Sequence, residues 1–183
     1  MEINMTIAAA IFMLLIALAD QLVKLWAIGS LRGQPPREFI KLFGTKIIDL
    51  CYVENNGAIF GIMKGVRPLL IALPIILSGV IFWGILKKRI VRPVQIFCGA
   101  AIAGGGLGNL IDRIFRGGWV VDYLDVQLFD FAVFNLADCF VTVGVILFSI
   151  DFLFFDKTDT VFGKTVKKTQ AASDDDGEKE NEQ

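Results

Sequence analysis

The sequence predicts an α-helical polytopic membrane protein, and three observations support this fold class. First, 55% of its 183 residues are hydrophobic, above the roughly 45–50% that is typical of soluble domains. Second, the apolar residues gather in four stretches, each close to the roughly 20 residues that a helix needs to cross a bilayer. Third, these stretches contain few charged residues, and charged residues such as Arg67, Lys87, Arg92 and Asp112 mark their ends. We therefore expect four transmembrane helices.

The first predicted span covers about 5–26 and is uncharged until Asp20 and Lys24. Its apolar run resembles a signal peptide, but no Lys or Arg precedes it and the apolar pattern continues past the small residues of a possible cleavage site. We therefore interpret it as a retained helix. The other three spans are predicted over about 68–86, 93–111 and 135–155.

The short connection between the second and third spans sets the predicted orientation. Residues 87–92 carry four cations in six positions, and short loops rich in Lys and Arg remain in the cytoplasm. Both termini are then cytoplasmic, and residues 27–67 and 112–134 lie on the outer face. We expect one domain over 1–155. The remaining residues, 156–183, form a cytoplasmic tail that we expect to be disordered, because it lacks apolar periodicity.

The two outer loops contain apolar and aromatic residues that predict surface elements. Residues 46–63 are typical of two short strands joined at Glu54–Gly57, because Asn-Gly between apolar runs favours a hairpin. A plain turn explains the same pattern equally well. In the second loop, Trp119 and Tyr123 lie where an interfacial aromatic belt is expected. We therefore expect a small outer β hairpin or sheet and a short amphipathic element at the membrane boundary.

The absence of histidine restricts the possible chemistry. Without an imidazole there is no Ser-His or Cys-His dyad and no HExxH zinc site. The three cysteines, Cys51, Cys98 and Cys139, follow neither a disulfide pattern nor a metal-ligand spacing, so we expect no metal and no cofactor. Carboxylate chemistry is the remaining class with suitable residues.

Ionisable side chains at membrane depth cost about 2.5–3.5 kcal/mol at a helix centre on insertion scales, so they are functional candidates. Six of them map to the outer ends of the predicted helices or just beyond: Asp20, Lys24, Asp112, Arg113, Asp122 and Asp138. Structural explanations also exist, since Asp20 and Lys24 are spaced for an i, i+4 ion pair. Asn135 with Asp138 resembles a helix capping box. Spacing alone therefore leaves a catalytic pair of Asp122 and Asp138 as one alternative.

The glycine-rich run 103–109 also has two interpretations. A phosphate-binding loop would end in Gly-Lys-Ser/Thr, which is absent here. Gly104 and Gly108 have the GxxxG spacing that lets helices approach closely. Helix packing is therefore the favoured interpretation.

Five motifs in chain order resemble the lipoprotein signal peptidases, also called signal peptidase II. They are DQLVK at 20–24, NNGAIFG at 55–61, GNLIDR at 108–113, VVDYL at 120–124 and FNLAD at 134–138. Together they extend from the first predicted helix into the fourth. Val23, Ile59 and Cys139 depart from the common pattern, but none of them removes a polar group with an assigned role.

The resemblance implies a membrane-embedded aspartic endopeptidase in which Asp122 and Asp138 are the catalytic pair. It also implies that further residues bind the substrate or support the site: Asp20, Lys24, Asn55, Gly57, Asn109, Asp112, Arg113 and Asn135. The implied substrates are prolipoproteins whose cysteine carries diacylglyceryl, cut just before that cysteine. The implied location is the bacterial cell (inner) membrane, with membrane lipids and no nucleic acid as partners. Family members also bind the cyclic peptide globomycin in the same site.

Two other functions fit the polar cluster without the resemblance. A small transporter or channel subunit would distribute its acids through the bilayer depth, whereas here they gather toward one face. An assembly or scaffold protein would use the same cluster to hold helices together. The sequence pattern alone does not separate these two functions from a peptidase. The choice of a peptidase therefore rests on the resemblance.

A peptidase site of this kind makes a further demand on its charges. Two carboxylates that share one proton supply a base and an acid together, and Asp138 at a helix N-terminus is biased toward the charged form. A cation in direct contact with the pair would remove the shared proton. We therefore expect Lys24 and Arg113 to pair mainly with Asp20, Asp112 or polar groups of the substrate.

Overall fold

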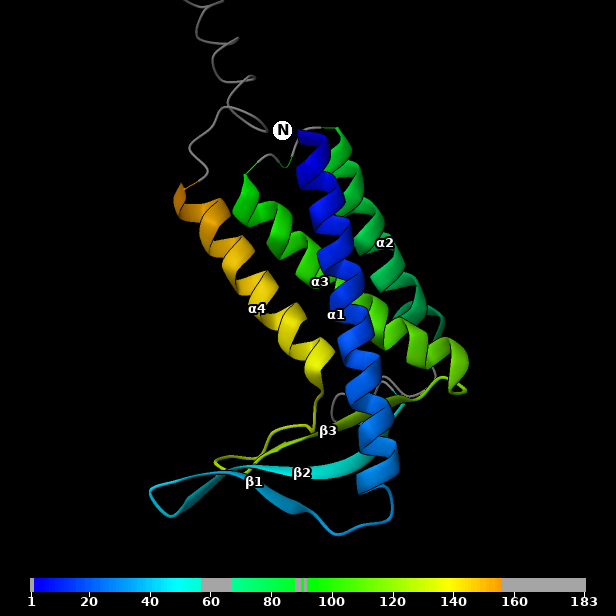
Figure 1. Ribbon diagram of the computed structural model, residues 1–183, viewed down its shortest axis with the longest axis vertical. Coiled ribbons are helices and arrows are strands. Elements are labelled where there is room, and N and C mark those ends of the chain that lie inside the picture. Colours follow the sequence, from blue (N-terminus) through cyan, green and yellow to red (C-terminus); the bar gives the residue numbers. More distant parts are fainter. Residues whose placement is uncertain (1, 57–66, 88–89, 91, 156–183) are drawn as a thin grey trace, which may run out of the picture.

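The computed structural model describes residues 2–56, 67–87, 90 and 92–155. Gly57, the second strand predicted within 46–63 and the predicted tail 156–183 lie outside the described residues. Helices lie side by side over most of the molecule, and a small sheet lies at the end opposite the N-terminus (Figure 1). The helices are α1 Glu2–Leu31, α2 Arg67–Leu86, α3 Pro93–Phe115 and α4 Leu136–Ile150, which continues into a π-helical turn at Asp151–Phe155.

Three of the helices are long and apolar enough to cross a membrane. They are α1, α3 and α4 with its π-helical turn, whereas the apolar part of α2 found among the described residues, Ile71–Leu86, is shorter. Leu14, Leu15 and Leu18 on α1 are more than half exposed, as expected of a helix whose neighbours are lipids. The structure thus supports three of the four predicted spans. The remaining one, predicted over 68–86, stays a prediction.

α3 is the central helix and contacts each of the other three. Small residues allow this close packing, as the glycine run predicts. A side chain at Gly105 would collide with the backbone carbonyl of Ala137 on α4, and one at Gly108 would collide with the carboxyl group of Asp20 on α1. The packing interpretation of residues 103–109 is therefore confirmed.

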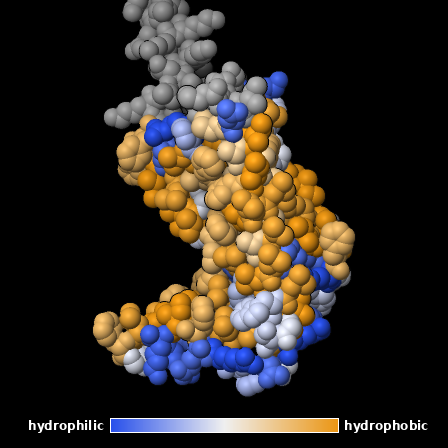
Figure 2. Space-filling view, viewed as in Figure 1, coloured by the Kyte–Doolittle hydropathy of each residue, from blue (hydrophilic) through white to orange (hydrophobic). Residues whose placement is uncertain are grey.

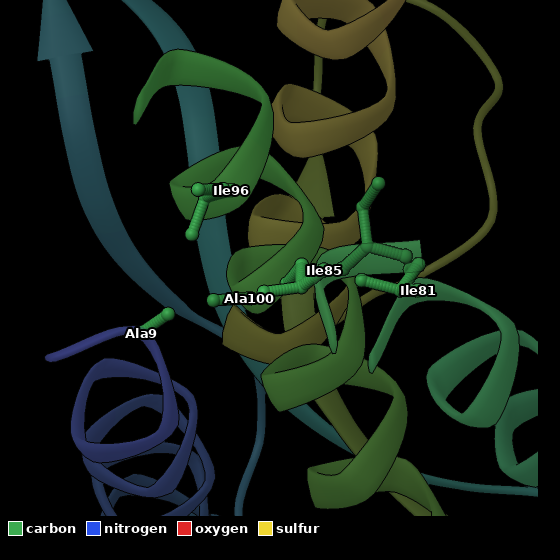
Figure 3. Close-up of a cluster of buried hydrophobic side chains, with 6 residues drawn as sticks. Ala9, Ile81, Ile85, Ile96 and Ala100 are labelled. Atoms are coloured by element: carbon green, nitrogen blue, oxygen red, sulfur yellow. The ribbon is translucent and has the colours of Figure 1, made fainter. Parts of the chain in front are cut away.

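The end of the bundle away from the sheet is held by an apolar cluster. Side chains from α1, α2 and α3 gather there, as Figure 3 shows: Ala9, Ile81, Ile85, Ile96 and Ala100. The opposite end, where α1, α3 and α4 approach the sheet, contains most of the buried polar residues, whereas Gln95 and Asp151 are buried at the end away from the sheet.

The sheet consists of β1 Arg37–Leu42, β2 Thr45–Asn55 and β3 Val120–Val126, in the order β1-β2-β3 and antiparallel throughout. β1 and β2 are joined at Phe43–Gly44, where both residues have positive φ, 47° and 84°, as the two-residue hairpin turns that match strand twist require. The strand predicted after residue 46 is β2. Its hairpin partner β1 was not predicted.

The second predicted outer loop, 112–134, contributes a strand rather than a separate surface element. β3 pairs with β2, and Asp122 lies opposite Val53 in that pairing. The aromatic belt interpretation therefore overlooked the β-branched and aromatic residues of VVDYLDV, which favour a strand. This long-range pairing connects the two predicted outer loops and brings Asp122 next to the end of β2.

Candidate active site

β3 and the start of α4 run side by side, and this arrangement positions both candidate aspartates. The backbone N–H groups of Tyr123 and Leu124 donate to the carbonyl of Phe134 at 3.0 and 2.9 Å, and Phe134 N–H donates back to Leu124 at 3.0 Å. Asp122 lies on the strand just before these bonds, and Asp138 lies in the first turn of the helix just after them.

Asn135 connects the two carboxyl groups directly. Its side-chain Nδ2 donates to Asp122 Oδ1 at 2.6 Å, and its backbone N–H donates to Asp138 Oδ2 at 3.2 Å. Its Oδ1 accepts from Asp138 N–H at 3.1 Å, which completes the predicted capping box. The capping interpretation is therefore confirmed. The same fully buried residue contacts both aspartates, and their role as a catalytic pair stays a prediction.

Two further asparagines hold the remaining carboxyl oxygens. Asn55 Nδ2, at the end of β2, donates to Asp122 Oδ2 at 2.8 Å. Asn109 Nδ2, on α3, donates to Asp138 Oδ1 at 2.7 Å. Each of the four carboxyl oxygens thus accepts an N–H bond, and each of these donors is uncharged.

Lys24 contacts Asn109, one of these asparagines, and pairs with acids other than the two aspartates. Its Nζ contacts Asp20 Oδ2 at 2.8 Å and Asp112 Oδ2 at 3.1 Å, and it donates to Asn109 Oδ1 at 2.8 Å. Lys24, Asp20 and Asp112 are fully buried. The expectation that Lys24 pairs with Asp20 and Asp112 is confirmed, and the three donors of the ammonium group are all used.

Arg113 differs from the expectation for the cations. Within the described residues it forms no ion pair, and its Nη1 donates to the Asn109 carbonyl at 3.4 Å. Its Nε is buried and has no partner there. Asp112 pairs instead with Arg116, at 2.8 Å. Binding of Arg113 to a substrate group stays a prediction.

Three residues of this region were missed by the sequence reasoning. Gln21 Nε2 donates to Asp112 Oδ1 at 2.9 Å and to the Gly108 carbonyl at 3.0 Å. The i, i+4 spacing of Asp112 and Arg116 was a signal that could have identified their pair. Tyr123 accepts a bond from Leu136 N–H at 3.1 Å, and nothing in its local sequence indicates this contact.

Burial controls the ionisation of Asp122. Removal from water, and to a smaller extent the negative charge of Asp138, raise the pKa of its carboxyl group to about 6. The N–H bonds from Asn55 and Asn135 and the charge of Lys24 lower the pKa and limit the rise. Asp122 can therefore keep a proton at a pH where an exposed aspartate is ionised.

A pocket of about 280 Å³ gives access to Asp122 from the sheet side. It is formed by the end of β2, the residues before β3 and the segment before α4: Val53, Glu54, Asn55, Asn56, Trp119, Asp122, Ala132 and Val133. One of the two paired carboxyl groups is thus both buried among protein atoms and in contact with an open cavity.

The last acid of the helices lies apart from this cluster, as expected. Asp151 follows α4 at its other end and pairs with Arg92 at 3.0 Å. Among the described residues the acids therefore do not form a path through the bundle. The four that share hydrogen-bonding or ion-pair partners lie toward the sheet, three on helices and one on β3: Asp20, Asp112, Asp138 and Asp122.

The fold and the site together define a helical membrane protein with a carboxyl pair of the kind that aspartic peptidases use. The family model described as signal peptidase (SPase) II matches residues 12–154. The chain therefore belongs to the signal peptidase II family.

Similar proteins and structures agree with this assignment. The chain is 40% identical over 137 residues to a lipoprotein signal peptidase of Halothermothrix orenii, covering 75% of the chain and 89% of that protein. It is 37% identical over 148 residues to one of Clostridioides difficile, covering 80% and 94%. Two solved structures described as a bacterial membrane enzyme, at 1.9 and 2.3 Å resolution, have TM-scores of 0.70 and 0.67 and identities of 28% and 27%. Each match covers 85% of this chain, and 96% and 94% of the respective solved chains.

Proposed function

We infer that this chain is an aspartic endopeptidase of a bacterial membrane that removes signal peptides from prolipoproteins. The cut falls just before the cysteine that carries diacylglyceryl, and Asp122 and Asp138 are the catalytic pair. One observation carries the assignment of the pair: Asn135 bridges the two carboxyl groups, while the donors around them are neutral amides. Neutral donors support two carboxyl groups without forcing both to ionise.

The environments of the two aspartates suggest which one holds the proton. Burial raises the pKa of Asp122 to about 6, whereas Asp138 lies in the first turn of α4, where the helix dipole favours negative charge. Asp138 then takes a proton from the attacking water, and Asp122 donates its proton to the carbonyl oxygen. When the tetrahedral intermediate collapses, Asp138 gives its proton to the leaving amine and Asp122 regains one from the hydroxyl group.

The buried ion cluster has a supporting role in this proposal. Lys24 is neutralised by Asp20 and Asp112, so its charge acts only weakly on the catalytic pair. Asp20 also accepts the Ala137 N–H through its other oxygen, at 3.0 Å. The cluster thereby connects α1 and α3 to the helix that carries Asp138.

Substrate binding is assigned to the residues around the pocket. Asn55 and Asn109 are uncharged and can hold an extended peptide backbone, and Arg113 has donors that no described residue uses. Gly57 is assigned to substrate binding only through the resemblance. A globomycin-type cyclic peptide would compete for the same pocket.

We assign four membrane spans, cytoplasmic termini and an outer active site to one domain over 1–155. The surface supports a membrane position with the sheet at its boundary: Figure 2 shows an apolar surface over the helices and a polar band along the lower edge of the sheet. The molecule is hollowed between the helices and the projecting end of the sheet (Figure 2). A sheet with its apolar side toward the helices suits a position on the outer membrane surface, with lipids filling the space.

Cleavage of a purified diacylglyceryl-modified prolipoprotein tests the proposal. We expect Asp122→Asn and Asp138→Asn each to lower kcat by on the order of 10³ or more, because loss of either carboxyl removes the acid or the base. Thermal unfolding should show that both variants fold. Asp130→Asn, an exposed acid outside the cluster, is the matched control and should cleave normally. Retained cleavage in either Asp122→Asn or Asp138→Asn would contradict the assignment, and unfolding of both would favour the scaffold interpretation.

A further inference from the structure

The first turn of α4 is held by side chains from three parts of the fold. A helix begins with backbone N–H groups that have no partner within the helix. Leu136 N–H donates to the phenol oxygen of Tyr123 at 3.1 Å, and Ala137 N–H donates to Asp20 Oδ1 at 3.0 Å. Asp138 N–H donates to Asn135 Oδ1 at 3.1 Å. Each of the first three N–H groups therefore has its own acceptor.

The acceptor for the first of these groups is rigidly placed. Tyr123 is 3% exposed and packs in an apolar cluster with Ala27, Leu31 and Val121. Its backbone is bonded to Phe134. Because the ring is buried and the strand that carries it is hydrogen-bonded, the position of the phenol oxygen constrains the position of the Leu136 N–H group.

Tyr123 and Asp122 are neighbours on β3, and their side chains leave the strand on opposite faces. Asp122 contacts the start of α4 through the Asn135 side chain, and Tyr123 contacts it through the Leu136 N–H. β3 thus contacts the start of α4 at two points, through Asp122 on one face of the strand and through Tyr123 on the other. The second point lies two residues before Asp138.

We propose that Tyr123 is a positioning residue whose phenol oxygen fixes α4 against β3 and so sets the geometry between Asp122 and Asp138. The inference rests on the proposed function of that pair. Loss of the oxygen leaves a buried N–H without its acceptor, and the start of α4 then shifts to find another. Small displacements of reacting groups cost rate more than they cost binding, because the transition state needs the tighter geometry.

The two tyrosines of the chain provide a matched test. Tyr123→Phe removes only the phenol oxygen at the start of α4. Tyr52→Phe removes the equivalent oxygen from an exposed bond to Glu54. With purified full-length protein and a diacylglyceryl-modified prolipoprotein, we expect Tyr123→Phe to lower kcat about tenfold with little change in KM. Tyr52→Phe should retain the wild-type kcat.

A double-mutant cycle identifies the contact responsible. Leu136→Pro removes the N–H donor itself, and proline is well suited to the first position of a helix. The preceding residue, Asn135, has the extended backbone that a following proline requires, with φ −134° and ψ −179°. In the Leu136→Pro background, Tyr123→Phe should have no further effect on kcat.

An unchanged kcat in Tyr123→Phe would overturn the inference, as would an equal loss in Tyr52→Phe or an undiminished effect in the proline background. If Leu136→Pro does not fold, the comparison of the two Tyr→Phe variants decides alone. A different result would overturn the proposed function itself: a wild-type protein that does not cleave the prolipoprotein, or Asp122→Asn or Asp138→Asn variants that still cleave it. A wild type that depends on both aspartates, with a fully active Tyr123→Phe, would reject only the positioning role.

Discussion

At the scale of single residues, the carboxyl groups of Asp122 and Asp138 accept hydrogen bonds from neutral donors, whereas the nearby buried cation pairs with other acids. Asn55, Asn109 and Asn135 contact the carboxyl pair, while Lys24 contacts Asp20 and Asp112. Amides stabilise a carboxylate less strongly than a cation does, so a proton can remain on the pair. The choice of residue type at each position therefore controls protonation.

This leads to a prediction about pH. The pKa of Asp122 is raised to about 6, so its proton is present below that pH and is lost above it. Because the mechanism needs that proton, kcat/KM should fall as the pH rises through about 6. The Asn55 N–H bond stabilises the ionised form and lowers the pKa. Asn55→Ala should therefore move the alkaline limb of the profile to higher pH.

The comparison variant is Asn56→Ala, which removes the neighbouring amide that also lines the pocket. A change in substrate binding would alter its rate, but the midpoint of its alkaline limb should stay in place. A limb that moves to lower pH in Asn55→Ala, or that moves equally in both variants, would show that Asn55 does not control the ionisation of Asp122.

At the scale of elements, the position of α4 depends on close contact with α3. Gly105 lies directly against the Ala137 carbonyl, one residue from Asp138. Any side chain there must push the first turn of α4 away from Asn109, which donates to the Asp138 carboxyl. The glycine run is therefore a requirement of the site as well as of the bundle.

Gly105→Ala should destabilise the protein by about 1–3 kcal/mol, because the added methyl group meets backbone rather than a flexible side chain. Thermal unfolding in detergent would measure the effect, and cleavage assays should show a lower kcat. Gly79→Ala on α2 is the matched control, since its methyl group would meet nothing within 4 Å. Alanine favours helix there, so that variant should be as stable as wild type or slightly more so. Equal destabilisation of both variants would contradict the contact-based explanation.

At the scale of the whole molecule, the apolar helices and the sheet indicate how the protein sits in a bilayer. The β1–β2 turn exposes Phe43 almost completely, at 99%, at the end of the molecule farthest from the N-terminus (Figure 1). Phe39, Ile40 and Leu42 on the adjoining strand β1 are exposed as well, and an exposed apolar patch marks a contact with a partner or a membrane. The cationic connection at 87–92 belongs to the other end of the helices.

Cysteine labelling would measure this orientation. In a variant without the three native cysteines, Phe43→Cys should react with a membrane-impermeant maleimide added to spheroplasts. Lys87→Cys, at the end of α2, should react only after the membrane is permeabilised, because the positive loop is expected to face the cytoplasm. The reverse pattern would invert the proposed topology, and labelling of both in intact spheroplasts would rule out a bilayer between them.

Much of the site was predictable because its residues carry local signals. Asp20 and Lys24 have helix spacing, Asn135 and Asp138 form a capping box, and the motifs resemble a known family. The partners of Asp112 were only partly predictable, since the choice between Arg113 and Arg116 depends on which face of α3 meets α1. Tyr123 was not predictable, because its partner is a backbone N–H group with no sequence signature.

By itself, the sequence determined the helical membrane class, the gathering of acids toward one end and the exclusion of imidazole chemistry. These features depend on hydropathy, spacing and composition, which are local properties of the chain. Only the tertiary structure decided that β3 pairs with β2 and docks against the start of α4. That pairing joins residues about seventy positions apart, and its stability comes from contacts that no local pattern encodes. For this reason the bridge between Asp122 and Asp138 through Asn135 became visible only in the folded chain.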